Sequence, residues 1–392
     1  MFEAQLEICA LYLPTTSLAH PIRHAMCKCW SGGRRRGGRR SRSQLSFLLN
    51  VKLHLNHRGV ILSTKHMRNE RERKNLPHSS TRTNADDARR PHTIMSSKKA
   101  KTSSDDLTAF LAAAEAAAKG AGRMIREAHD SRAKGGAVKG IESKGSEETQ
   151  TVDLVTATDK ACEDFILSML KEQFPDHDFI GEESSFTGPD GGPPEGALQL
   201  SDKPTWIVDP LDGTTNFVHG YPLVTVSIGL CVDKKPAVGV VYNPIMDELC
   251  SAATGKGCFL NGVRCHVGNA TGVTSALVVN NIGASRNPKT NEITAKRILA
   301  LLQANIRGLR NSGSAAQNMM HVACGRLDAY FEDGFGGPWD VCAGAVLLQE
   351  AGGICRDHLG GPFVLKAGKG QLLCGNAAVV EDIARVLKSV EE

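Results

Sequence analysis

Two aspartates flank a tight turn that directly follows a short apolar run. The run Trp206-Ile207-Val208 predicts a buried strand with Asp209 at its carboxyl end, where Pro210 is expected to stop further pairing. Asp212 lies next along the turn and precedes Gly213-Thr214-Thr215, which predicts a helix start. The free amides of a helix start attract anions. Carboxylate oxygens beside bound phosphate are ligands that suit Mg²⁺, so this stretch predicts a magnesium and phosphate site.

Two further acidic segments support a metal site, although each has a structural alternative. Glu182-Glu183 follows the apolar residues Phe179-Ile180, where the alternative is a pair of surface glutamates. Asp340 follows Trp339 and begins an apolar segment with helical spacing, where the alternative is an N-cap. Asp209 and Asp212 have an alternative too, because Asp-x-x-Asp-Gly is a common turn and either side chain can cap the next helix.

These segments resemble motifs of the inositol monophosphatase family. The similarity extends from about residue 107 to the C-terminus, and its motifs occur in the family's order. The motifs are residues 153–159, 181–184, 206–217 and 339–345. The resemblance implies a Mg²⁺-dependent, lithium-sensitive phosphatase that is usually a homodimer. It also implies an α/β fold of the layered αβαβα sandwich type.

The resemblance also assigns roles to particular residues. It implies metal binding by Glu182, Asp209, the carbonyl of Leu211, Asp212 and Asp340. It implies that Thr214, supported by Asp159 and close to Glu182, orients and deprotonates the attacking water. The residues expected to contact substrate are Gly213, Thr214, Thr215, Gly313, Ser314, Ala315, Glu332 and Asp340.

The expected reaction is hydrolysis of a small phosphate monoester, with myo-inositol monophosphate as the first candidate. Divalent cations neutralise the phosphate and activate water for in-line attack, so no phosphoenzyme is required. Glu332 matches a glutamate that accepts hydrogen bonds from ring hydroxyls, which suits a phosphorylated polyol. The segment 333–338 is one residue longer than the family pattern, and the loop lysine is placed at Lys144. The alternatives are a hexose 1-phosphate, histidinol phosphate or a 3′-phosphonucleotide, or a binding protein without catalysis.

The surrounding sequence predicts helices and strands in mixed order. Helical spacing is found from Asp105 or Asp106 to about residue 125, and again from Thr158-Asp159 to just before Pro175. Residues 225–231 are expected to pair with 237–242 across a turn. Further strands are predicted at 277–280, 327–331 and 371–374, and further helices at 293–304, 314–324, 340–351 and 377–389.

The charge of the chain divides it into a basic extension and an acidic body. Residues 1–94 contain 18 Lys and Arg against 6 Asp and Glu, whereas the remainder contains 29 against 36. We therefore expect a disordered extension over residues 1–104 and a catalytic domain over 105–392. The extension suits a transit peptide, or lies upstream of a true start at Met95. Nucleic-acid binding is not favoured, since no aromatic residues interleave with its arginines.

The remaining composition concerns the compartment and the cysteines. No apolar stretch approaches the roughly twenty residues of a membrane-spanning helix, and we expect a cytoplasmic protein, with organellar import through the extension as the alternative. Nine cysteines lie in the body without any Cys-x-x-Cys spacing. They are expected to be reduced thiols in the core, not disulfides or a zinc site.

Overall fold

A computed structural model describes residues 102–134, 141–143, 154–185 and 200–391. The predictions for residues 1–101, Lys144 and Asp153 lie outside these ranges. The short elements are β1 (Glu142–Ser143), β2 (Leu154–Val155), α6 (Glu182–Ser185), α7 (Thr214–His219) and the 3₁₀ turn η1 (Val273–Ser275).

Two long helices, α4 (Ser104–Ala133) and α5 (Ala157–Gln173), form the first layer. Each begins with a capping box, in which a hydroxyl side chain accepts from a backbone amide and an aspartate accepts in return. Ser103 and Asp106 form the box of α4, and Thr156 and Asp159 form the box of α5. The N-cap of α4 is therefore Ser103, two residues before Asp105, from which we expected helical spacing to begin.

A seven-stranded sheet forms the second layer. Its strands are β3 (Asp178–Gly181), β4 (Thr205–Asp212), β5 (Thr225–Val232), β6 (Lys235–Asn243), β7 (Glu248–Ala253), β8 (Gly257–Leu260) and β9 (Val263–Cys265). They lie in sequence order, with β3 parallel to β4 and every later pair antiparallel. The predicted hairpin of β5 and β6 is confirmed, and Asp233 and Lys234 make its turn with positive φ angles of 49° and 62°.

Two helices, a second sheet and two further helices complete the fold. The helices are α8 (Pro288–Gln303), α9 (Ala315–Ala323), α10 (Pro338–Glu350) and α11 (Ala377–Glu391). The strands are β10 (Leu277–Asn280), β11 (Gly308–Arg310), β12 (Ala329–Phe335), β13 (Ile354–Arg356) and β14 (Gly370–Gly375). The order in this sheet is β11-β10-β12-β14-β13.

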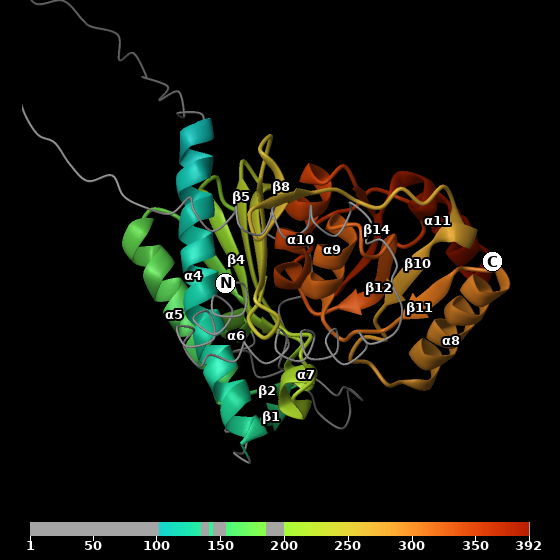
Figure 1. Ribbon diagram of the computed structural model, residues 1–392, viewed down its shortest axis with the longest axis horizontal. Coiled ribbons are helices and arrows are strands. Elements are labelled where there is room, and N and C mark those ends of the chain that lie inside the picture. The colour runs from blue at the N-terminus through green and yellow to red at the C-terminus, as the bar shows by residue number, and fades with distance from the viewer. Residues whose placement is uncertain (1–101, 135–140, 144–153, 186–199, 392) are drawn as a thin grey trace, which may run out of the picture. The chain divides into compact units, whose positions relative to one another are not determined.

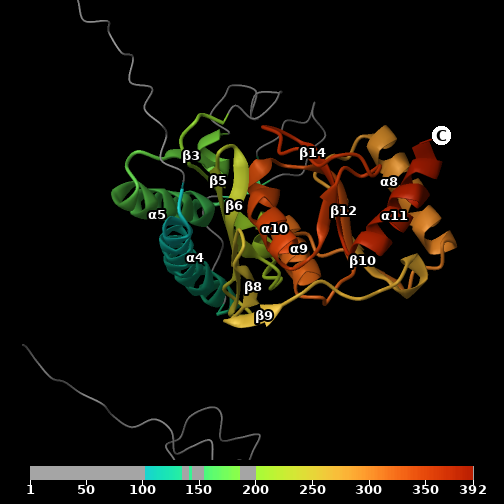
Figure 2. The same cartoon turned by 90° about the horizontal axis from the view of Figure 1, so that it is seen from above.

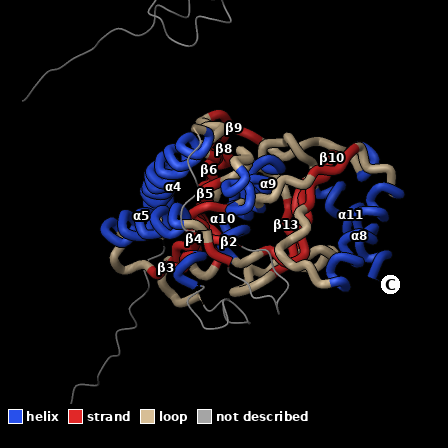
Figure 3. The backbone as a smooth tube through the Cα atoms, turned by 90° about the horizontal axis from the view of Figure 1, so that it is seen from below, coloured by secondary structure: helices blue, strands red, loops and turns tan. Residues whose placement is uncertain are grey.

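The elements stack as five layers, which Figures 2 and 3 show edge-on. Helices α4 and α5 cover one face of the large sheet, α9 and α10 lie between the two sheets, and α8 and α11 cover the far face of the small sheet. Apolar cores fill the spaces between the layers. The core between α4, α5 and the large sheet includes Trp206, the core around α9 and α10 includes Met319 and reaches both sheets, and the core between the small sheet and α8 and α11 includes Ile383. The predicted αβαβα sandwich is confirmed. Within the described ranges, no helix is both long and apolar enough to cross a membrane.

One prediction about β4 was wrong. Pairing was expected to stop at Pro210, but β4 continues to Asp212, which pairs with Thr225 of β5. The register shifts between Asp209 and Asp212, so Pro210 lies within a bulge where its missing amide donor costs no ladder hydrogen bond. The bulge turns two aspartates toward one region at the end of the strand.

Candidate active site

Three aspartates from two elements converge at the end of the large sheet. Asp209 and Asp212 belong to β4, and Asp340 belongs to the first turn of α10. One carboxylate oxygen from each lies within 4.8 Å of the other two, and all three side chains are buried. The structure therefore brings together three of the four acidic side chains that we expected to bind metal, at a spacing that allows them to share a cation.

The backbone around the bulge fixes the first two carboxylates. The amide of Leu211 donates to Asp209 Oδ1 at 3.0 Å, which holds that side chain against its own turn. Gly213 then adopts a φ of 93°, a conformation that favours glycine, and a Cβ there would lie 3.0 Å from the carbonyl oxygen of Leu223. The chain can therefore reverse into α7 immediately after Asp212.

Asp212 also interacts with the amino end of α9. Its carboxylate accepts from Ser314 Oγ at 2.6 Å, from the amide of Ala316 at 2.7 Å and from the amide of Ala315 at 3.3 Å. These donors, together with the positive end of the helix dipole, favour the charged carboxylate. Ser314 and Ala315, which we expected to contact substrate, thus contact Asp212 in the structure.

Asp340 lies in the first turn of α10, and its side chain accepts hydrogen bonds from the backbone amides just before the helix. Its Oδ2 accepts from the amide of Gly336 at 2.6 Å and from the amide of Gly337 at 3.3 Å. Asp340 is therefore not the N-cap, which is Gly337, but the N3 residue whose carboxylate accepts from the N-cap amide. One carboxylate oxygen stabilises the helix start while the side chain stays within the aspartate cluster.

Glu182 stands where β3 ends and α6 begins, and it acts electrostatically on the three aspartates. Sequence reasoning missed the residue that holds this corner, Glu163 of α5. Its carboxylate accepts from the amides of Glu183 and Ser184, each at 2.8 Å. A Cβ at Gly181 would lie 2.4 Å from this carboxyl group, so glycine lets β3 pass close to it. The sequence signal was weak: Glu163 has the helical spacing of the apolar residues of α5, which indicates burial but not its partners.

Thr214 and Asp159 are in direct contact, as expected. Thr214 Oγ1 donates to Asp159 Oδ1 at 3.0 Å, and the carbonyl of Leu211 lies 3.3 Å from the same hydroxyl. The other carboxylate oxygen of Asp159 belongs to the capping box with Thr156. Asp159 is fully buried, so these bonds fix both of its oxygens.

Glu332 extends the acidic region from β12. Its Oε2 accepts from Asn281 Nδ2 at 3.0 Å and from the hydroxyl of Tyr330. Asn281 in turn accepts from the amide of Gly313 at 3.1 Å through Oδ1. Asn281 thereby links Glu332 to the loop before α9, and no sequence motif singled it out. Thr215 is exposed on α7.

Comparison with known proteins places the chain in a family. The sequence profile of the inositol monophosphatase family matches residues 106–392. Inositol monophosphatase 3 of Solanum lycopersicum is 51% identical over 258 residues, which are 66% of this chain and 89% of the tomato protein. The chain belongs to the inositol monophosphatase family.

Solved structures agree with this assignment. The inositol monophosphatase of Anabaena is 34% identical, with a TM-score of 0.58 and coverage of 72% of this chain and 97% of that one. A structure described as inositol monophosphate bound to SaIMPase-II is 27% identical, with a TM-score of 0.56 and coverage of 72% and 95%. As a member of this family, the chain is a phosphoric monoester hydrolase.

The electrostatics of the phosphatase site show why a cation fits it. Burial, followed by the charges of Glu182, Asp212 and Asp340, raises the pKa of Asp209 well above its usual range. Burial and neighbouring carboxylates likewise raise the pKa of Asp340. Burial raises the pKa of Asp212 to about 6, although Ser314, Ala316 and Ala315 donate to it and oppose the shift. Crowded carboxylates in a low dielectric repel one another, and a divalent cation would relieve that repulsion.

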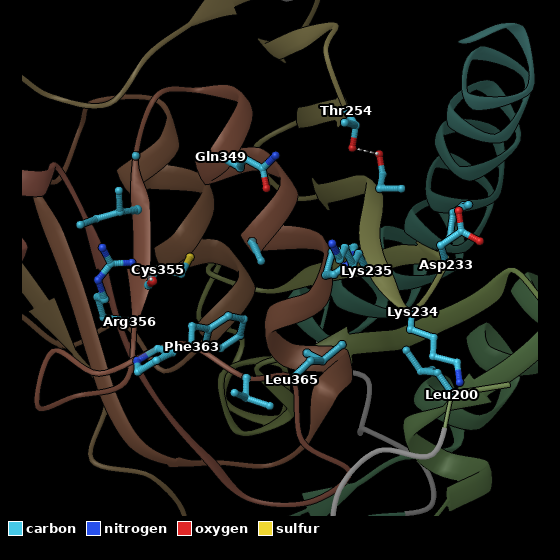
Figure 4. A pocket seen from close by; sticks show the side chains of 18 of the residues that line it. Leu200, Asp233, Lys234, Lys235, Thr254, Gln349, Cys355, Arg356, Phe363 and Leu365 are labelled. Carbon is cyan, nitrogen blue, oxygen red and sulfur yellow. Dashed lines mark hydrogen bonds between the residues drawn. The ribbon is translucent and has the colours of Figure 1, made fainter. Parts of the chain in front are cut away.

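A pocket away from the acidic site is shown in Figure 4. It is formed by the turn after β5, the carboxyl end of α10 and the segment around β13. Its lining includes Leu200, Lys234, Gln349, Arg356 and Phe363. None of the predicted site residues is among the described residues that line it, so it is distinct from the acidic site.

Proposed function

We propose that this phosphatase hydrolyses inositol monophosphate with Mg²⁺ held by Glu182, Asp209, the Leu211 carbonyl, Asp212 and Asp340. The observation that carries the proposal is the convergence of three buried aspartates with oxygens within 4.8 Å. Carboxylate and carbonyl oxygens suit Mg²⁺, which shares its coordination with substrate phosphate. The relative SaIMPase-II, described with inositol monophosphate bound, supports the substrate.

Bound Mg²⁺ would supply charge neutralisation and water activation. The residues of the chain would position the attacking water. A hydroxyl has one proton to donate, and Thr214 donates it to Asp159 at 3.0 Å. The lone pairs of Thr214 Oγ1 therefore remain to accept a proton from water, and Glu182 completes the orientation. Asp159 is fixed by its capping box and would receive the proton that Thr214 releases.

Recognition of the phosphate and the ring would use the surrounding loops. We assign phosphate contact to Gly213, Thr214 and Thr215, whose backbone begins α7. Glu332 would accept from ring hydroxyls. In the described part of the chain, the hydrogen bonds to Glu332 reach Oε2 alone, so Oε1 can accept one from substrate. Gly313, Ser314, Ala315 and Asp340 would complete the site from the facing elements.

The test is phosphate release by the purified chain from a panel of esters, with and without Mg²⁺. The panel contains inositol 1-phosphate, a hexose 1-phosphate, histidinol phosphate and a 3′-phosphonucleotide. The highest kcat/KM is expected for the inositol ester and only with Mg²⁺. A higher value for another ester would replace the substrate but keep the hydrolase. Equal release without divalent cation would overturn the metal scheme.

Three further proposals follow from the family. We expect a homodimer, inhibition by lithium and a catalytic domain of residues 105–392 in the cytoplasm. Light scattering that finds only monomer would overturn the first, and unchanged turnover in lithium would overturn the second. Mass analysis of the native N-terminus tests whether the protein begins at Met1 or at Met95. Loss of a transit peptide in that analysis would overturn the cytoplasmic location.

A further inference from the structure

Four cysteines from four parts of the chain meet at one edge of the large sheet. Cys250 belongs to β7, Cys258 to β8, Cys265 ends β9 and Cys324 directly follows α9. The Sγ atoms of Cys250 and Cys258 lie 3.4 Å apart, and those of Cys258 and Cys265 also lie 3.4 Å apart. Cys324 Sγ lies 3.6 Å from that of Cys265 and 3.9 Å from that of Cys250.

These four separations are close to the sulfur–sulfur distances around a thiolate-bound metal and too long for a disulfide. Zinc binds thiolate sulfur at about 2.3 Å, so the ligands of a regular tetrahedron lie about 3.8 Å apart. Bonded sulfurs would lie at about 2.0 Å. The sulfurs of Cys250, Cys265 and Cys324 also lie within 4.8 Å of one another, so one ion can reach all three. Cys258 lies 3.4 Å from two of these sulfurs, those of Cys250 and Cys265, but it is not within 4.8 Å of all three, so its side chain would have to rotate to act as the fourth ligand.

The sheet register explains why the sequence concealed this group. Cys258 pairs directly with Cys265 across β8 and β9, while Cys250 of β7 is diagonal to Cys258, whose partner is Ala252. Directly paired and diagonal side chains share one face of a sheet. The meander therefore aligns three thiols without any Cys-x-x-Cys spacing, and α9 brings the fourth.

Burial and charge at the group also fit a bound ion. Cys250 and Cys258 are buried, whereas Cys265 and Cys324 are partly exposed, which leaves a route for the ion to enter. Arg326 acts electrostatically on Cys324, and its guanidinium is held by two 2.7 Å hydrogen bonds to Glu248. Such a positive group would offset part of the negative charge of four thiolates.

We propose that Cys250, Cys258, Cys265 and Cys324 bind a structural zinc ion, separate from the acidic phosphatase site. Soft sulfur ligands in a tetrahedral arrangement select zinc and not magnesium. The ion would join the edge formed by β7, β8 and β9 to the carboxyl end of α9. Our prediction from sequence, reduced thiols in the core and no zinc site, is replaced by this proposal for these four cysteines.

The experiment measures metal content and ligand type on the full chain, purified under reducing conditions from zinc-supplemented culture. About one zinc ion per chain is expected in the cluster. Replacement by cobalt should give the intense absorption of tetrahedral thiolate coordination, which oxygen ligands do not give. Cys265→Ser and Cys324→Ser should lose this zinc and the cobalt signal. Cys355→Ser is the matched control, since Cys355 is also partly exposed but outside the cluster, and should keep both.

Two further experiments separate this proposal from the phosphatase proposal and from a loss of folding. Asp209→Asn, which alters the acidic site, should keep the cobalt–thiolate signal, so failure of the phosphatase proposal is distinguishable from failure of this one. If the serine variants do not fold, alkylation of the unsubstituted protein replaces them: a chelator should expose Cys265 and Cys324 to the reagent. Four freely reactive thiols after zinc loading, a disulfide within the group, iron in place of zinc, or equal loss in Cys355→Ser would each overturn the proposal.

Discussion

Helix α9 connects two clusters of opposite chemical character. At its amino end, Ser314 and the amides of Ala315 and Ala316 donate to Asp212 in a group of buried carboxylates. At its carboxyl end, Cys324 contacts the sulfurs of Cys250 and Cys265. Hard oxygen ligands and soft sulfur ligands select different cations, so one short helix can separate two metals. The helix dipole favours the carboxylates only at the end where they lie.

The largest expected effect comes from Asp209→Asn. Loss of a carboxylate shared by the acidic cluster should lower kcat/KM by about 100-fold or more, since weaker changes around metal ligands already cost roughly 10- to 100-fold. The metal-free variant should unfold at a higher temperature than the unsubstituted protein, because one of several repelling charges is gone. Phosphate release and thermal unfolding with and without Mg²⁺ measure both effects.

The same variant tests whether the two clusters are independent. Its zinc content should equal that of the unsubstituted protein. If the variant lost both zinc and activity, the acidic cluster and the cysteine cluster at the two ends of α9 would not be independent.

The second-largest effect is expected from loss of the Thr214 hydroxyl and not from loss of the adjacent Thr215 hydroxyl. Thr214→Ala removes the group that donates to Asp159 at 3.0 Å, and kcat should fall about 100-fold, within the range of general acid–base contributions. Thr215→Ala is the matched control, because its side chain is exposed and its backbone amide is kept. Steady-state kinetics on the inositol ester measure both, and equal losses would remove the special role of Thr214.

A smaller effect is expected from the positioning residue Glu163. Glu163→Gln replaces an acceptor of two amides with a group that can accept at only one oxygen, so the corner that carries Glu182 should loosen. The Mg²⁺ concentration for half-maximal activity should rise about 10-fold, while kcat at saturating Mg²⁺ changes less. Glu172→Gln, exposed on the same helix, is the control. A general loss of stability with an unchanged Mg²⁺ requirement would contradict this role.

The smallest effect concerns pH and the metal-free protein. Burial raises the pKa of Glu332 from 4.5 to about 7 and that of Asp212 from 3.8 to about 6. The folded state therefore holds these protons more tightly than the unfolded state. The free energy of unfolding should fall as pH rises from about 4 to about 7, because the stabilising proton is lost.

Denaturant unfolding across that range measures the slope. Glu332→Gln should flatten its upper part, and Mg²⁺ should restore stability at neutral pH. An identical slope in the variant would show that Glu332 does not titrate there. The cysteine cluster at the carboxyl end of α9 should not contribute to the change of unfolding free energy with pH.

Sequence reasoning reached the acidic site because its signals are local. Asp209 ends an apolar run, Asp340 begins an apolar helix, and family motifs join them in order. It failed where partners are set by register or by packing between distant elements. Pro210 was taken as a strand end because a missing donor usually stops pairing, and the bulge that accommodates it depends on β5.

The missed residues follow the same rule. Glu163 is one acid among several on α5, and only the fold puts Glu183 and Ser184 beside it. Asn281 gains its meaning from the pairing of β10 with β12, which brings Glu332 within reach. Three of the cysteines lie on neighbouring strands whose register no spacing rule reveals, and the fourth follows α9.

The capping box of α5 has a consequence for local opening of the chain. Asp159 accepts from the Thr156 amide with one oxygen and from Thr214 with the other, so the first turn of the helix and the hydroxyl share a single carboxylate. When that turn frays, Thr214 loses its acceptor at the same moment. Amide hydrogen exchange at the start of α5 should therefore report the fraction of molecules in which Thr214 lacks its acceptor and which cannot catalyse the reaction.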